Sequence, residues 1–207
     1  MNEYSTVLGE AKKEFIEKKS RFICSVKPVY NEQQAVDFIK KISGFHKSAS
    51  HNVFAYIISG DVENQRASDD GEPQGTAGIP VLEVIKREGL TNVCVVVTRY
   101  FGGILLGAGG LIRSYSTCAK LGLYEAKICR MILYNKIGIV INYNQLGRLQ
   151  SSMASLGNTI VNIDYTDFVK IYLKIKYNKI EYTVKMITEL TNGEANIEYL
   201  EKFYDIE

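Results

Sequence analysis

One stretch decides the fold of the second half of the chain: Phe168-Val169-Lys170-Ile171-Tyr172-Leu173-Lys174-Ile175-Lys176-Tyr177. Its odd-numbered positions are apolar or tyrosine, and its even-numbered positions hold three lysines, Phe168 and Tyr172. Successive side chains of a β-strand point to opposite faces of the sheet, so a strict period of two is typical of a strand with one buried face. The stretch therefore predicts a strand at the surface of a domain core.

The segments on either side of this strand complete a known motif. The sequence predicts strands at 131–142 and 159–165, a helix at 144–156, a helix carrying Ile180, Val184 and Ile187, and a last strand at 196–203. The order β-α-β-β-α-β is that of the ferredoxin-like split βαβ unit. We therefore expect a ferredoxin-like C-terminal domain at 131–207.

The outward face of the Phe168–Tyr177 strand allows two interpretations. Lys170, Lys174 and Lys176 interleaved with aromatic rings could stack bases and hold phosphates on an open sheet. A solvated outer face has the same composition, and a four-stranded sheet of this kind always has one uncovered face. We favour the solvated face.

The first half has its own sequence of elements and predicts a second two-layer α/β domain at 1–130. Strand patterns cover 15–29, with a break at 18–20, and also 52–59 and 92–98. A capping signal at Asn31 opens one helix, Ile79–Lys86 form a second, and a third follows Gly110. The whole chain is therefore expected to be an α+β protein of two domains.

Composition excludes several classes of protein. Of the 207 residues, 46% are hydrophobic and 23% charged, as in an ordinary globular protein without a disordered tail. A net charge of +2 gives no global field for nucleic acid, so any such binding needs a local patch. The N-terminus lacks a signal peptide pattern, and no run of about 18 apolar residues could span a bilayer. We expect a cytoplasmic protein without a membrane partner.

The four cysteines do not form a recognisable site. Cys24, Cys94, Cys118 and Cys129 are widely spaced, include no C-x-x-C pair and lie in apolar runs, where a reduced cysteine acts as a small hydrophobic residue. The sequence therefore predicts no disulfide framework, no metal site and no cofactor.

Glycine is concentrated where we expect the functional surface. Nine of the 17 glycines lie between Gly71 and Gly110, and eight of these nine fall in two blocks that each lead into a predicted helix. The N–H groups and dipole of a helix N-terminus favour an anion, and two arginines bracket the second block. The candidate anion or RNA site comprises Arg99, Gly102, Gly103, Gly107, Gly109, Gly110 and Arg113. The alternative is that the glycines only make tight connections and close helix–sheet contacts, and the spacing matches neither a P-loop nor a dinucleotide fingerprint.

Polar residues near the first glycine block form a second candidate group. Asp69, Asp70 and Glu72 could bind a cation or exchange protons, but acidic residues at such positions more often cap a helix or bond to their own turn. The same choice, between a pocket role and ordinary hydrogen bonding, applies to the two histidines, His46 and His51. The candidate polar site comprises His51, Ser68, Asp69, Asp70, Glu72, Gly75, Thr76, Tyr100 and Tyr115.

Several long motifs resemble the IMPACT/YigZ family. They are Lys19-Ser20-Arg21-Phe22, Ala49-Ser50-His51-Asn52, Ser68-Asp69-Asp70-Gly71-Glu72-Pro73 with Gly75-Thr76-Ala77-Gly78, Thr98-Arg99-Tyr100-Phe101-Gly102-Gly103, and Gly107-Ala108-Gly109-Gly110-Leu111-Ile112-Arg113-Ser114-Tyr115. The resemblance implies a first domain like domain IV of elongation factor G and a second like domain V of the same factor. It covers nearly the whole chain.

The resemblance also implies a class of function. Eukaryotic members regulate translation, and bacterial members are described as nucleic-acid or ribosome binders; the eukaryotic partner-binding module does not precede the shared domain here, so the kinase-related role is not carried over. We expect a translation-associated binding protein that contacts RNA, the ribosome or a translation factor through the glycine-rich surface. The alternative is an enzyme acting on a small phosphorylated or nucleotide substrate at the same site, for which the sequence supplies no nucleophile and base.

Overall fold

The chain forms two compact units. The computed structural model describes residues 2–60 and 64–207. The first unit comprises Tyr4–Arg130, and the second comprises Met131–Glu207 together with the extreme N-terminus of the chain. Among the described residues, no helix has the length and apolar character needed to cross a membrane.

The first unit is built on an antiparallel sheet with the strand order β2-β3-β6-β4-β5. Its strands are β2 (Ala11–Glu17), β3 (Ser20–Pro28), β4 (His51–Ile58), β5 (Asn64–Ser68) and β6 (Val93–Tyr100), and β1 (Glu3–Val7) precedes them. The sequence pattern did not predict β5. This strand is short and polar, and at the edge of the sheet it has little apolar surface to bury.

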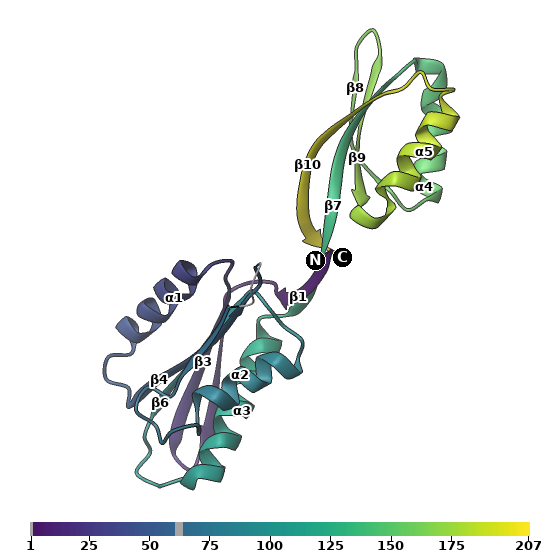
Figure 1. The fold of residues 1–207 in the computed structure, drawn as a ribbon. Coiled ribbons are helices and arrows are strands. Elements are labelled where there is room, and N and C mark those ends of the chain that lie inside the picture. The colour runs from purple at the N-terminus through teal and green to yellow at the C-terminus, as the bar shows by residue number, and fades with distance from the viewer. Residues whose placement is uncertain (1, 61–63) are drawn as a thin grey trace. The chain divides into compact units, whose positions relative to one another are not determined.

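Helices cover both faces of this sheet (Figure 1). They are α1 (Glu32–Phe45) on one face, and α2 (Gly78–Arg87) and α3 (Gly107–Glu125) on the other. The central strand β6 serves both cores, because Val93, Val95 and Val97 pack toward α2 and α3 while Cys94 and Val96 pack toward α1. The unit therefore has three layers where the sequence predicted two.

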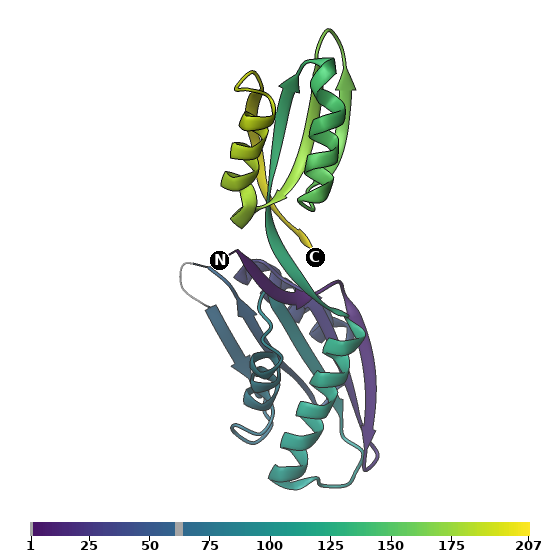
Figure 2. The ribbon, with the colours of Figure 1, turned by 90° about the vertical axis from the view of Figure 1, so that its right-hand side faces the viewer.

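The second unit has the predicted ferredoxin-like arrangement. Its strands pair in the order β10-β7-β9-β8, all antiparallel, and both helices pack on one face (Figures 1 and 2). The elements are β7 (Ile128–Ile141), α4 (Leu146–Ser155), β8 (Thr159–Tyr165), β9 (Val169–Lys176), α5 (Ile180–Leu190) and β10 (Asn196–Ile206), with single 3-10 turns at Tyr143–Gln145 and Tyr177–Lys179. The predicted mixed class and the split βαβ order of the second half are confirmed.

The Phe168–Tyr177 stretch has the buried and the exposed face that its period of two indicates. Val169, Ile171, Leu173 and Ile175 of β9 are fully buried against α4 and α5. The lysines between them pair with acidic residues near the C-terminus: Lys170 with Glu198, Lys174 with Asp205 and Lys176 with Glu207. The outward face of β9 is therefore a ladder of ion pairs within the unit.

The cysteines are free thiols that pack as small apolar residues. Cys24, Cys94 and Cys118 are buried in the first unit, and Cys129 is half-buried. Contact with the Cys118 thiol, together with burial, raises the pKa of the Cys24 thiol. Helix α3 passes so close to β3 that a Cβ on Gly122 would lie 2.2 Å from the sulfur of Cys24. Only glycine fits this helix–sheet contact.

Candidate functional site

A buried ion pair lies at the centre of the glycine-rich region. Arg99 is on the core-facing side of β6, and its Nη1 donates to Oε1 of Glu72 at 2.6 Å. The side chains of Arg99 and Glu72 are only 6% and 3% exposed. Two charges removed from water at this depth are tolerated only when they are paired and hydrogen-bonded. The pair therefore fixes the two glycine-rich blocks against each other.

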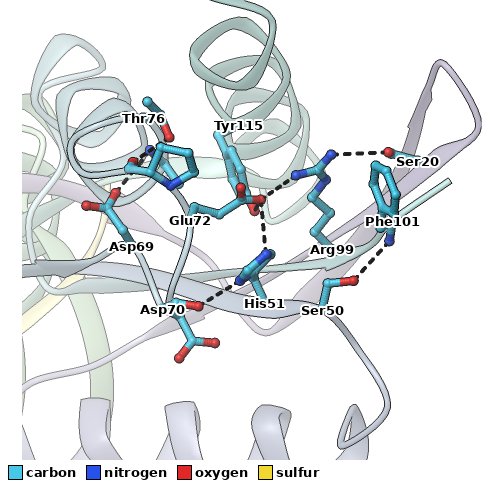
Figure 3. A network of polar contacts seen from close by, with 12 residues as sticks. Ser20, Ser50, His51, Asp69, Asp70, Glu72, Thr76, Arg99, Phe101 and Tyr115 are labelled. Atoms are coloured by element: carbon cyan, nitrogen blue, oxygen red, sulfur yellow. Dashed lines mark hydrogen bonds and ion pairs between the residues drawn. The ribbon is translucent and has the colours of Figure 1, made fainter. Parts of the chain in front are cut away.

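Two further side chains complete this network (Figure 3). The hydroxyl of Tyr115, from α3, donates to Oε1 of Glu72 at 2.7 Å, and Nη2 of Arg99 donates to Oγ of Ser20 at 3.4 Å. Burial and the neighbouring Glu72 carboxylate raise the pKa of Tyr115 well above its ordinary value, so this hydroxyl keeps its proton and remains a donor. The network joins β3, β6, α3 and the loop before α2.

His51 lies at the edge of the network, with a defined orientation. Its Nδ1 is 2.8 Å from the carbonyl oxygen of Asp70, and a carbonyl only accepts, so Nδ1 carries the proton. Nε2 then faces Glu72, 3.9 Å from Oε1. Asp70 is held in turn, since its carboxylate accepts the backbone N–H of Asn52 at 2.6 Å.

Asp69 is engaged by the backbone and does not point toward the network. Its carboxylate accepts the N–H groups of Gly75, Ala77 and Gly78 at 2.8, 3.1 and 2.8 Å. Burial alone would raise the pKa of this carboxyl, but the three N–H groups together lower it below its ordinary value. Asp69 thereby caps α2 from outside the helix, which agrees with the capping interpretation of the acidic cluster.

The rest of the first polar block serves the same turn. The hydroxyl of Thr76 donates to the carbonyl oxygen of Pro73 at 2.6 Å, and Oγ of Ser68 accepts the N–H of Asp70 at 3.2 Å. Gly75 adopts a left-handed φ of +76° that favours glycine. These residues shape the loop that carries Glu72.

A hollow of about 410 Å³ opens beside the network. His51, Glu72 and Arg99 line its polar side, and the first residues of α3, Gly107 and Ala108, line another. The residue before α3 is Leu106, whose side chain offers no cap, so the first N–H groups of this helix are left for another acceptor. Nε of Arg99 is also buried without a hydrogen-bond partner among the described residues.

The rim of the hollow is apolar and exposed. Phe101 is 50% and Leu105 84% exposed, and both line it. Phe101 is held in place, because its N–H donates to Oγ of Ser50 at 3.1 Å and its ring packs 5.6 Å from the Arg99 guanidinium. Large apolar side chains held at the surface around a hollow are typical of a binding site.

The structure gives the predicted glycines different roles. Gly102 makes a close backbone approach, since a Cβ there would lie 2.0 Å from the backbone of Lys19. Gly103 has a φ of +81° in the loop, whereas Gly107, Gly109 and Gly110 form the first turn of α3, which begins four residues before the predicted helix. A Cβ on Gly107 would meet nothing within 4 Å, so this helix end is open to its surroundings.

Two predicted site residues do not join this group. Arg113 is exposed and lines a different hollow, with Phe15, Lys18 and Thr117, whereas Arg99 is buried. The structure therefore does not bring the two arginines together, because Arg113 lies on the outer side of α3. Tyr100 follows Arg99 on the same strand and so points to the opposite face, where its hydroxyl is 2.9 Å from Nδ1 of His46.

Sequence reasoning missed several residues of the site. Ser20, Phe101 and Leu105 were not among the candidates, although Ser20 and Phe101 lie within the motifs that carried the family resemblance. Ser20 also accepts the N–H of Gly102 at 3.2 Å. The available signal for Leu105 was its position within a glycine-rich block, but its exposure cannot be read from the sequence.

Comparison with protein families assigns both halves of the chain. The Impact N-terminal domain matches residues 18–123, which contain every residue of the network and the hollow described above. A domain of unknown function (DUF1949) matches residues 139–194, within the second unit.

Individual relatives agree with these matches. The chain is 39% identical to IMPACT family member YvyE of Bacillus subtilis, over 98% of this chain and 95% of the relative. It is 29% identical to IMPACT family member YigZ of Escherichia coli, over 89% and 92%. A protein IMPACT homolog of Dictyostelium discoideum is 32% identical over 53% of this chain and 32% of its own length. A solved structure described as a hypothetical protein superposes with a TM-score of 0.63 at 27% identity, over 97% and 98%.

Proposed function

The chain belongs to the IMPACT family, and from this premise we propose that it is a translation-associated binding protein. The proposed contact surface is the hollow beside the Glu72–Arg99 pair, with its apolar rim and the open end of α3. The proposed partner is RNA, the ribosome or a translation factor, which places the protein in the cytoplasm.

One observation carries this proposal: a rigid network lies beneath a rim that remains exposed. The Glu72 carboxylate holds Arg99 and Tyr115 at 2.6 and 2.7 Å, whereas Phe101 and Leu105 present apolar surface to the outside. Because the network already holds the residues beneath the rim in place, less conformational entropy is lost when a partner binds to the exposed apolar side chains. The uncapped N–H groups of α3 add donors for an anionic or carbonyl group on that partner.

The same contacts support binding over catalysis at this site. Asp69 accepts three backbone N–H groups, and Glu72 is held by a guanidinium and a phenol. A general base needs a carboxylate oxygen that reaches its substrate proton, whereas both oxygens of Asp69 and Oε1 of Glu72 already accept hydrogen bonds. We therefore favour the binding role over the enzymatic alternative.

The test is co-sedimentation of the full chain with purified ribosomal subunits and, separately, titration against labelled RNA over a salt series. We expect Leu105→Ser combined with Phe101→Ser to weaken association at least tenfold without lowering the melting temperature. Phe45→Ser is the matched control, since this side chain is 74% exposed at the end of α1 and does not line the hollow. Association that is equally strong in both variants would exclude the rim from the contact surface.

Arg113 tests whether the contact surface extends past the hollow to the outer side of α3. Because Arg113 is exposed on the outer side of α3, Arg113→Ala should reduce the salt dependence of RNA or subunit binding by about one phosphate contact. Arg113→Lys should recover the charge but not a bidentate contact, and so restore binding only in part. An unchanged salt slope in Arg113→Ala would show that the contact surface does not extend to this arginine.

A further inference from the structure

A further hollow lies within the second unit, at one end of its helical layer. It has a volume of about 550 Å³, and its lining includes Asn135, Tyr177, Tyr199 and Lys202. Asn135 and Lys202 are register partners on β7 and β10, and Tyr177 lies in the turn that leads into α5. These elements converge at the start of α5 (Figure 1).

Asn135 is the unusual residue of this hollow. It is 2% exposed, and its amide nitrogen has no hydrogen-bond partner among the described residues. Asn135 belongs to the inward-facing row of β7, because it lies two positions before Ile137 and four before Ile139, both of which are fully buried. A buried amide without a partner is destabilising, and an apolar residue of similar size would avoid this penalty. Its presence at a hollow therefore points to a ligand group.

The remaining lining restricts the chemistry of that ligand. Tyr177 and Tyr199 give the hollow aromatic walls. Tyr199 is 61% exposed, and the Lys202 ammonium lies 5.0 Å from the ring centre of Tyr177. Lys202 and Glu181 carry opposite charges, which favours an uncharged ligand over an anion. The first residue of α5, Ile180, also lines the hollow, but its backbone N–H donates to the carbonyl oxygen of Tyr177, so the polar groups offered to a ligand come from side chains.

We propose that this hollow binds a flat, uncharged heterocycle with an amide-like edge, the chemistry of a nucleobase. The Asn135 amide pairs with the polar edge of the ring, as asparagine does with the donor and acceptor of adenine, and Tyr177 and Tyr199 contact its face. The base comes either from a free nucleoside or from an RNA strand, and the two sources share this chemistry. The site lies outside the surface proposed above and does not depend on it.

The experiment titrates the isotopically labelled full chain with each of the four ribonucleosides and, in a separate arm, with short single-stranded oligonucleotides. We expect at least one base to shift the Asn135 side-chain amide resonance in a saturable manner. Shifts with nucleosides identify a small-molecule site, whereas shifts with oligonucleotides alone identify a base within a strand. If neither probe shifts this resonance, the proposal is overturned.

Two variants make the result specific. Tyr199→Ala should weaken binding about tenfold, whereas the matched control Tyr182→Ala should not, because Tyr182 is 57% exposed on α5 and does not line the hollow. Asn135→Leu should abolish binding while the urea midpoint stays equal or rises, since an unpaired amide has been removed. Binding that is unchanged in Tyr199→Ala, or a lower urea midpoint in Asn135→Leu, would instead indicate a structural role for Asn135. Ribosome co-sedimentation tests the surface of the first unit in a separate experiment, so failure of either proposal can be told from failure of the other.

Discussion

Arg99 and Lys174 are both cations on an inner strand of a sheet, and both pair with a carboxylate. The Arg99 side chain is 6% exposed, and its partner Glu72 also holds Tyr115. Lys174 is 19% exposed on the open face of the second unit, and its partner Asp205 is 47% exposed. A buried charge that loses its partner remains desolvated, whereas an exposed one is solvated by water. The two pairs therefore have the same chemistry but different structural consequences, and only the first can hold a site rigid.

Of the substitutions that test this contrast, removal of the buried Glu72 carboxylate should change the free energy of unfolding most. Glu72→Ala leaves Arg99 charged and unpaired, and should lower the free energy of unfolding of the first unit by about 3–5 kcal/mol. Urea denaturation measures it. Combining Glu72→Leu with Arg99→Met removes both charges and should recover much of the loss. A Glu72→Ala loss below about 1 kcal/mol would contradict the buried-pair interpretation.

The same variant tests whether the units at 1–130 and 131–207 are separate domains. If they fold independently, the NMR spectrum of the second unit should remain native in Glu72→Ala at urea concentrations that unfold the first unit. Simultaneous loss of both sets of resonances would show that the chain unfolds as one cooperative body.

An intermediate effect is expected at Asp69. Asp69→Ala leaves the N–H groups of Gly75, Ala77 and Gly78 without their acceptor and should cost about 2 kcal/mol of unfolding free energy. Asp70→Ala is the matched control, because the neighbouring carboxylate accepts one backbone N–H and should cost less. Equal losses in the two variants would contradict the assignment of Asp69 as the cap of α2.

The pH dependence of Asp69 follows from its lowered pKa. A carboxyl whose folded pKa is below its ordinary value of 3.8 stabilises the fold above that value, and this contribution is lost as the pH falls through the folded pKa. The stability difference between the wild type and Asp69→Asn should therefore be constant near neutral pH and shrink below about pH 4. Urea midpoints across this pH range measure the difference. A difference that grows on acidification would contradict a lowered pKa of Asp69.

The smallest effect is expected on the exposed ladder. Lys174→Met should change the unfolding free energy of the second unit by about 1 kcal/mol or less, and 0.5 M salt should reduce the difference further. A loss as large as that of Glu72→Ala would mean that the ladder is not solvated and would remove the contrast between the two units.

The parts of the fold that local periodicity determines were predictable. The alternation from Phe168 to Tyr177 identified a strand, its buried face and the fold of its unit, because strand geometry alone sets that pattern. The third layer of the first unit was not predicted, since β6 reads as a continuous apolar run and such a run does not say what covers each face.

The site was predictable as a region but not as a set of contacts. Glu72 and Arg99 were both candidates, yet their pairing joins residues 27 positions apart and depends on the path of two loops. The strand period could have separated Arg99 from Tyr100, because neighbouring residues of a strand face opposite ways. Leu105 and Ser20 required the tertiary structure.

The three thiols buried around Gly122 and β6 also give the protein built-in reporters of its own opening. Burial raises the pKa of Cys94 and contributes to that of Cys24, so neither thiol reacts with an alkylating reagent until the first unit opens. Half-buried Cys129 is more accessible and should be modified first. Mass spectrometry of the slower modifications would then time the opening of the first unit in the unmodified sequence, with and without a bound partner.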